Sequence, residues 1–177
     1  MPWPEYETWQ RQFLTASWEK LTETGAIYYN HKPRPQKQEV WLPTSLNPGL
    51  PLRQIIIWAR AGGINFAPTH YMPTCEWLLL FAKPGFRLRD KGASGAGDIW
   101  YIPQESNPSH PAPFPVKLPK TIIETTRASI VYDPFMGIGT TAVAAKELGR
   151  KFIGIEITPE YCEIAVKRLR QGVLNFL

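Results

Sequence analysis

The chain has 177 residues, of which 44% are apolar, and its 20 basic and 15 acidic side chains give a formal net charge of +5. This length and composition predict one globular domain with a sizeable core, and they are too small for two independent domains. No apolar run approaches the roughly 20 residues of a membrane helix, and the N-terminus lacks the features of a signal peptide. We therefore expect a soluble protein of the cytoplasm.

The cysteines and histidines argue against a disulfide-rich protein and against a zinc protein. The two cysteines are too few for a disulfide framework, and the three histidines are scattered, without the spacing of zinc ligands. We expect a reduced protein with no metal. The positive charge favours a polyanionic partner, with an ordinary solvated surface as the alternative.

The N-terminal third begins with a helical pattern. Over residues 5–21 the apolar side chains recur at three- and four-residue spacings, which predicts a helix packed on a sheet. Thr24 and Gly25 end it, and residues 26–29 form a short β-prone run. Residues 31–37 are so rich in proline and charge that we expect no regular structure there.

The middle of the chain holds two continuous apolar runs, residues 54–58 and 76–81. They lack the alternation of half-exposed strands, so we expect both to be central strands of a sheet. From residue 83 to residue 115 glycine, proline and polar residues dominate. This stretch is typical of an inserted loop region.

The C-terminal part predicts a βαβ unit. Residues 130–132 form an apolar strand, a glycine turn follows, and a helix from about 140 to 148 ends at Gly149 before a strand over 151–157. Thr158 and Pro159 then have the residue types of an N-cap and a first helical position. A final helix should begin there.

The glycine turn lies where a strand feeds a helix, which is where open α/β sheets bind nucleotides. Its glycines, Gly137 and Gly139, also match the dinucleotide fingerprint, and Glu156 stands at the end of the next strand, where an acid can bind ribose hydroxyls. Asp133 favours S-adenosylmethionine over a dinucleotide, because a carboxylate repels a pyrophosphate and attracts the cationic S-adenosylmethionine. The plainer alternative is that Asp133 only caps the turn.

Two stretches carry a family resemblance: DPFMGIGTT over residues 133–141 and AAKELGRKFIGIE over residues 144–156. They resemble the beta-class DNA amino-methyltransferases of restriction-modification systems and phages. The resemblance implies a class I, Rossmann-like α/β fold in circularly permuted order, with a mostly parallel sheet and one antiparallel strand. It implies transfer of a methyl group from S-adenosylmethionine to adenine N6, which we favour, or cytosine N4 in double-stranded DNA, in a bacterial, phage or viral setting.

The family's order of segments divides this chain within a single domain, residues 1–177. Residues 1–82 correspond to the helix and strands after the catalytic segment, residues 83–109 to a target-recognition insert, and residues 110–177 to the cofactor-binding segment. By this resemblance the insert faces DNA through Arg87, Arg89 and Lys91, unless it is only a solvated basic loop.

The cofactor segment supplies the expected binding residues. Its start, residues 110–120, resembles the part that closes over the methionine end of the cofactor, with a proline-rich linker as the alternative reading. The expected cofactor-binding residues are Asp133, Phe135, Gly137, Gly139, Thr140, Thr141 and Glu156, with Lys117 and Leu118 as weaker candidates.

The family's catalytic signature, an Asp, Ser or Asn followed by Pro-Pro and an aromatic residue, is not found in the sequence, so the catalytic residues are unknown. That signature holds the weakly nucleophilic amine and stacks on the flipped base. In the family its strand lies beside the cofactor-binding strand, so we expect an incomplete sheet whose unpaired backbone is costly. A partner chain, a rearranged neighbour or a homodimer would supply the strand.

Three functions remain open. The first is a DNA methyltransferase that is complete only with an N-terminal segment from a partner or a longer gene product. The second is an inactive remnant or subunit that binds S-adenosylmethionine or DNA without transferring methyl groups. The third, a nicotinamide-dependent enzyme, is permitted by the glycine spacing and disfavoured by Asp133.

Overall fold

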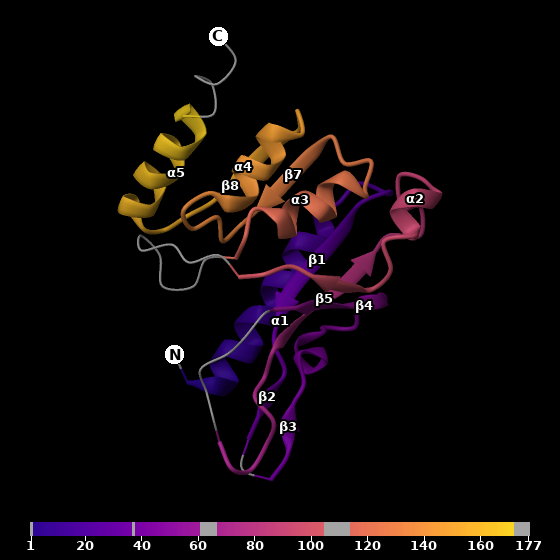
Figure 1. Cartoon of the computed structure of the whole chain (residues 1–177), viewed down its shortest axis with the longest axis vertical. Coiled ribbons are helices and arrows are strands. Elements are labelled where there is room, and N and C mark those ends of the chain that lie inside the picture. The colour runs from indigo at the N-terminus through magenta and orange to yellow at the C-terminus, as the bar shows by residue number, and fades with distance from the viewer. Residues whose placement is uncertain (1, 37, 61–66, 105–113, 172–177) are drawn as a thin grey trace. The chain divides into compact units, whose positions relative to one another are not determined.

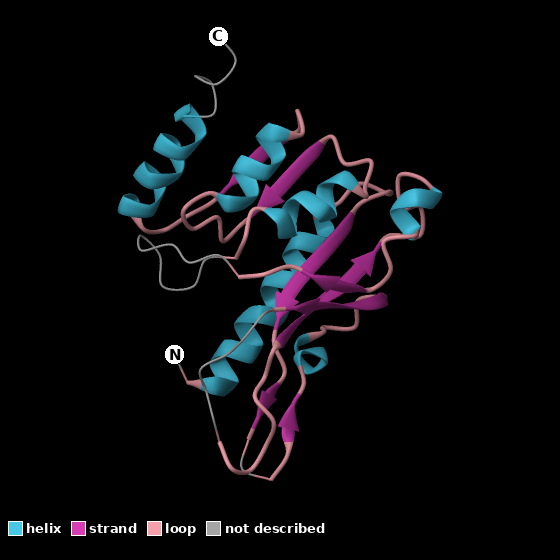
Figure 2. Ribbon diagram, in the orientation of Figure 1, coloured by secondary structure: helices cyan, strands magenta, loops and turns pink. Residues whose placement is uncertain are grey.

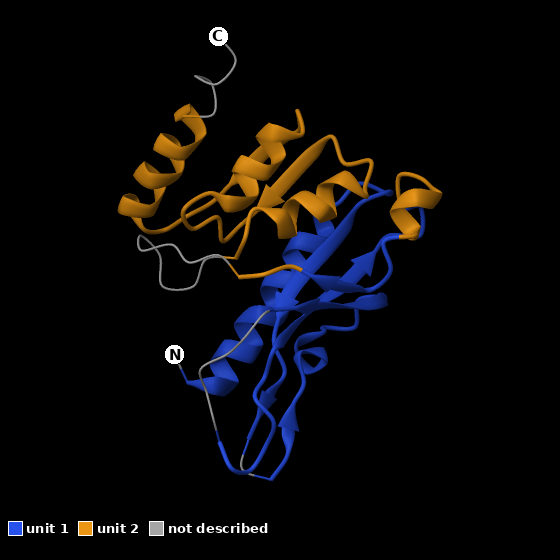
Figure 3. Ribbon diagram, viewed as in Figure 1, with its two compact units in different colours: residues 1–87, 96–101 blue, residues 88–95, 102–177 orange. Residues whose placement is uncertain are grey.

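The computed structural model describes residues 2–36, 38–60, 67–104 and 114–171. These residues divide into two units, shown in blue and orange in Figure 3. The first unit comprises residues 1–87 and 96–101, and the second comprises residues 88–95 and 102–177. Each unit is described separately.

The first unit is a four-stranded sheet with a long N-terminal helix (Figure 1). The strand order is β1-β5-β4-β6; β5 runs antiparallel to both of its neighbours, while β4 and β6 are parallel. Three strands therefore run in one direction and β5 in the other, as expected from the sequence. The elements are α1 (Trp3–Glu19), β1 (Ala26–His31), β4 (Leu52–Ala59), β5 (Cys75–Ala82) and β6 (Ile99–Tyr101).

Apolar side chains of α1 pack on one face of this sheet. Leu14 from α1, Tyr29 from β1, and Leu79 and Phe81 from β5 are buried in one cluster. In the strand register Tyr29 lies opposite Leu79, so both side chains point to the same face. The helix predicted over residues 5–21 is thus confirmed, and so are the two central strands, because β4 and β5 each pair on both edges.

The second unit is built around a βαβ element, with its helices in cyan and strands in magenta in Figure 2. Strands β7 and β8 are parallel, and α4 connects them. Val131 of β7 packs against the buried residues Ile123, Ala144 and Ala145 of α3 and α4. The elements are α2 (Lys91–Ser94), α3 (Lys117–Glu124), β7 (Ile130–Asp133), α4 (Thr140–Glu147), β8 (Lys151–Gly154) and α5 (Pro159–Gln171).

Two sequence-based expectations are wrong. Residues 31–37 are partly regular, because His31 ends β1 and the short strand β2 (Arg34–Pro35) pairs with β3 (Val40–Trp41) before the 3-10 helix η1 (Pro43–Leu46). A proline is tolerated in such a two-stranded ladder because an edge position needs no amide there. Proline and charge in this stretch therefore do not exclude a short two-stranded ladder.

The stretch from residue 83 to 115 is likewise not only loop. Asp90 caps α2, with its Oδ1 accepting a hydrogen bond from the amide of Ala93 at 2.8 Å. The apolar residues Ile99, Trp100 and Tyr101 form β6 and pair with β4. The described helices include none that is both long and apolar enough to span a lipid bilayer.

Candidate cofactor site

The glycine elbow, defined here as residues 133–140, joins the end of β7 to the start of α4. Gly137 and Gly139 have φ angles of +54° and +82°, in the left-handed region where a side chain is disfavoured. The amide of Gly139 donates to the carbonyl of Met136 at 2.9 Å, and its carbonyl accepts the first hydrogen bond of α4, from Val143. Two glycines therefore let the chain reverse within a few residues.

Gly139 is also required by packing. A Cβ atom at this position would lie 2.8 Å from the Cβ of Ala165 on α5, which is closer than real Cβ contacts. Ala165 is itself buried. Helix α5 thus approaches the backbone of the elbow directly.

Asp133 organises the first half of the elbow. Its Oδ1 accepts a hydrogen bond from the amide of Phe135 at 3.0 Å, and its carbonyl accepts one from the amide of Ile155. Asp133 therefore does cap the turn, as the plainer alternative held. A carboxylate has about four acceptor positions, so this contact leaves capacity for a ligand cation. The side chain of Phe135 is 49% exposed beside it.

Glu156 ties the elbow to the chain beyond β8. One carboxylate oxygen accepts from the amide of Thr158 and the other from the amide of Gly137, both at 2.8 Å. The hydrogen bond from the Thr158 amide is the main reason that the pKa of Glu156 lies below the usual glutamate value; desolvation opposes it, and the Gly137 amide lowers the pKa further. The side chain is therefore an anion at neutral pH. Each oxygen can accept a second hydrogen bond, such as one from a ribose hydroxyl.

The remaining predicted cofactor residues lie at the start of two helices. Thr140 and Thr141 open α4; Thr140 is buried and Thr141 is half-buried. Lys117 and Leu118 open α3, where Lys117 is exposed and Leu118 is only 3% exposed. Helix α3 packs on α4. The structure thus brings Asp133, Phe135, Gly137, Gly139, Thr140 and Glu156 to one elbow, and it buries the Leu118 side chain.

One residue at the elbow was missed by the sequence analysis. The guanidinium of Arg168 on α5 donates from Nη1 to the carbonyl of Ile138 at 2.8 Å and to Oγ1 of Thr140 at 3.2 Å. Arg168 stands among several basic residues of α5, so its pattern alone gives no signal. Only the packing of α5 beside the elbow identifies it.

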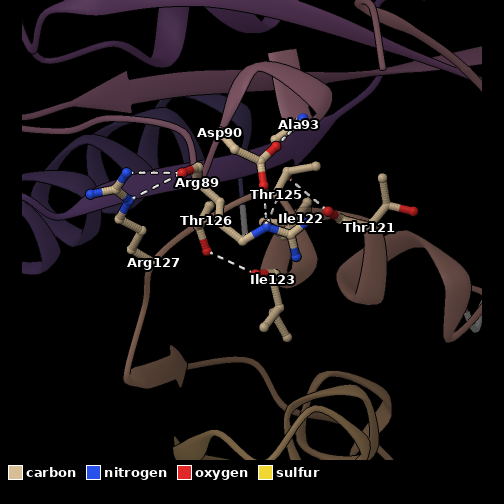
Figure 4. A network of polar contacts seen from close by, with 9 residues as sticks. All are labelled: Arg89, Asp90, Ala93, Thr121, Ile122, Ile123, Thr125, Thr126 and Arg127. Carbon is tan, nitrogen blue, oxygen red and sulfur yellow. Dashed lines mark hydrogen bonds and ion pairs between the residues drawn. The ribbon is translucent and has the colours of Figure 1, made fainter. Parts of the chain in front are cut away.

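The basic residues expected to face DNA are engaged locally. The Arg87 guanidinium donates to the carbonyls of Pro84 and Phe86. The Arg89 side chain forms an ion pair with Asp90 at 2.9 Å, and the carbonyl of Arg89 accepts two hydrogen bonds from Arg127. Figure 4 shows both sets of contacts. Lys91 is exposed at the start of α2. The Arg89–Asp90 pair is half-exposed, so it contributes little to stability.

The network in Figure 4 also fixes the backbone near α2. The amide of Arg89 donates to the carbonyl of Thr125, directly after α3. Asp90 accepts from Ala93, which together with the Arg89 side chain lowers the pKa of Asp90. Arg89, within the predicted target-recognition insert, is therefore held against the end of α3.

The second strand ends at Gly154 and not at residue 157 as the sequence predicted, so Glu156 lies just beyond it. A parallel βαβ unit with an acidic glycine elbow and an acid directly after the second strand defines a Rossmann-like, class I methyltransferase fold. Residues 3–167 match the N6/N4 methyltransferase family, described as DNA methylase. The chain belongs to this family. The family depends on S-adenosylmethionine, so the resemblance and the cofactor class expected from the sequence are confirmed.

Individual relatives and solved structures similar to this chain are also DNA methyltransferases. A type II methyltransferase of Streptococcus pneumoniae, M2.DpnII, is 50% identical over 137 residues, which cover 73% of this chain and 48% of the relative. The PvuII DNA methyltransferase, a cytosine-N4-specific enzyme, has the same fold with a TM-score of 0.78 at 23% identity, covering 93% of this chain and 70% of that one. The M1.HpyAVI–S-adenosylmethionine complex gives a TM-score of 0.51 at 28% identity, over 67% of this chain and 61% of that one.

The matched region covers a smaller share of the curated relatives than of this chain. The chain spans between 33% and 58% of the length of the first curated relatives that it matches. These relatives therefore contain a large part that has no counterpart in the aligned residues.

Proposed function

We propose that this chain is the cofactor-binding part of a DNA amino-methyltransferase, which transfers the methyl group of S-adenosylmethionine to an exocyclic amine, adenine N6 before cytosine N4. The observation that carries the proposal is the glycine elbow, with the Asp133 carboxylate at its start and Glu156 bonded to its centre. In the reaction the amine nitrogen attacks the methyl carbon, the carbon–sulfur bond breaks, and S-adenosylhomocysteine and a proton are released.

The proposed cofactor site divides the ligand between the two acids. Asp133 and the exposed ring of Phe135 lie toward the positively charged methionine part, since a carboxylate attracts a cation. Glu156 accepts the ribose hydroxyls with its remaining lone pairs. The elbow backbone at Gly137 and Gly139 permits close approach, and Thr140 and Thr141 begin the helix below it. Lys117 and Leu118 remain secondary candidates.

We propose that a segment carrying the Pro-Pro-aromatic signature completes the catalytic site, supplied by another chain or by a longer gene product. Support comes from the face of the β7–β8 pair opposite Val131. Its apolar side chains Ile130, Tyr132 and Ile153 are between 45% and 56% exposed, as is Ile155 directly after β8. Parallel strands are normally covered on both faces, because their apolar residues must leave water. This face is where added structure would be stabilising.

Double-stranded DNA is the proposed substrate, and Arg87, Arg89 and Lys91 are its proposed contacts. The net charge of +5 supports a polyanionic partner. Arg89 already forms an ion pair with Asp90, so a DNA phosphate would have to take the place of the Asp90 carboxylate. Breaking this half-exposed ion pair costs little free energy.

A methyl-transfer assay tests this proposal. The chain is incubated with tritium-labelled S-adenosylmethionine and mixed-sequence duplex DNA, alone and together with the part of the Streptococcus pneumoniae relative that lies outside the matched region. We expect label in DNA only in the combined sample, and digestion to nucleosides identifies N6-methyladenine or N4-methylcytosine. Cofactor binding without transfer in the combined sample would support the inactive remnant instead.

A further inference from the structure

Helix α5 is not part of the strand-turn-helix that forms the elbow, yet it contacts the elbow at two points. Ala165 packs under Gly139, and Arg168, one turn later on the same side of the helix, donates to the elbow on both sides of that glycine. Arg168 lies one residue beyond the stretch that matches the family, which ends at residue 167. Its contacts with the elbow are taken from the structure, because the sequence gives no signal for them.

The two acceptors of Arg168 lie on either side of Gly139. The carbonyl of Ile138 precedes Gly139, and the hydroxyl of Thr140 follows it, so a single nitrogen, Nη1, joins both flanks of the left-handed residue. Thr140 is 5% exposed and Ile138 is 3% exposed, while Arg168 is half-buried, so the two bonds are partly shielded from water. Hydrogen bonds to a charged group are stronger than neutral ones, and a buried acceptor is costly to leave without a donor.

We propose that Arg168 is a positioning residue, which holds the glycine elbow in the shape that binds S-adenosylmethionine. Loss of the guanidinium leaves the Ile138 carbonyl and the Thr140 hydroxyl without this donor, and the elbow relaxes around Gly139. The amide of Gly137 and the first turn of α4 then move relative to Glu156. This inference rests on the proposed function, because it concerns the affinity of the same site.

The test measures the dissociation constant of S-adenosylmethionine by titration calorimetry, at a temperature where circular dichroism shows each variant folded. We expect Arg168→Gln to weaken binding by about tenfold to a hundredfold. Arg168→Lys should recover most of the affinity, since a lysine keeps the charge and a donor. Arg170→Gln, at an exposed arginine of the same helix, is the matched control and should bind as the wild type does.

A coupling measurement separates positioning from general stability. Thr140→Val removes one acceptor, so it should weaken binding in the wild type and add little further loss in the Arg168→Gln background. Additive losses would overturn the inference, as would equal affinity of Arg168→Gln and wild type.

Variants that do not fold or do not bind are also informative. If Arg168→Gln does not fold, the same cycle is run with Arg168→Met, which keeps an apolar side chain and removes the donors, and full additivity there overturns the inference. A folded wild-type chain that does not bind S-adenosylmethionine would overturn the proposed function as well. Normal wild-type binding with an unaffected Arg168→Gln variant would overturn only the role of Arg168.

Discussion

Gly139 carries two separate constraints, its left-handed backbone and its contact with Ala165, and they can be measured apart. Gly149 has a similar positive φ of +64°, but a Cβ there meets nothing within 4 Å. We expect Gly149→Ala to lower the free energy of unfolding by about 1–2 kcal/mol through backbone strain alone.

Gly139→Ala should cost about 1–3 kcal/mol more than Gly149→Ala, because the added methyl group overpacks against α5. Urea unfolding of both variants measures the difference. Equal losses would show that α5 does not press on the elbow.

At the scale of residues, the sequence revealed the acids and glycines of the elbow but not the arginine behind it. Glu156 was predictable because the nucleotide-binding pattern has an acid about where the next strand ends, and the structure bonds it to Gly137. Arg168 was not, because a basic residue on a helix usually faces solvent. Its contact depends on how close α5 comes to Gly139, which no local pattern encodes.

At the scale of elements, α1 is fixed on its sheet by one buried polar pair as well as by apolar packing. The hydroxyl of Tyr29 on β1 donates to Oε1 of Gln10 on α1 at 2.8 Å, and Gln10 is 6% exposed. Burial is the main reason that the pKa of Tyr29 is raised above its usual value, so the hydroxyl keeps its proton.

Tyr29→Phe should therefore lower the free energy of unfolding by about 1–3 kcal/mol, because it leaves the Gln10 oxygen buried without its donor. Tyr101→Phe is the matched control, since Tyr101 is 82% exposed and its loss should be close to neutral. Thermal or urea unfolding measures both. A neutral Tyr29→Phe variant would mean that the pair does not hold α1.

The longer elements were predictable from periodicity, and the short ones were not. Helix α1 and strands β4 and β5 have enough residues for a pattern to appear. Strands β2 and β3 have two residues each, and β6 has three, so they exist only because a neighbouring strand offers hydrogen bonds. A glycine-rich sequence such as that before β6 gives no sign of such a partner.

At the scale of the whole molecule, chain order is the main evidence for the permuted fold. The sheet that contains β1, β4 and β5 precedes the βαβ unit of β7 and β8, with β5 as the antiparallel strand. The resemblance predicted this order from the C-terminal motif alone. It could not predict how the elbow residues bond to one another, because those contacts join β7, β8 and α5.

The central claim is that the elbow and Glu156 bind S-adenosylmethionine, and titration calorimetry on the folded chain tests it most directly. We predict one site for S-adenosylmethionine and none for NADH. Glu156→Ala should weaken binding by a few-fold to a hundredfold, or about 1–3 kcal/mol, while Glu163→Ala, at an exposed acid on α5, should not change it. Binding of NADH in place of S-adenosylmethionine, or an affinity unchanged by Glu156→Ala, would contradict the claim.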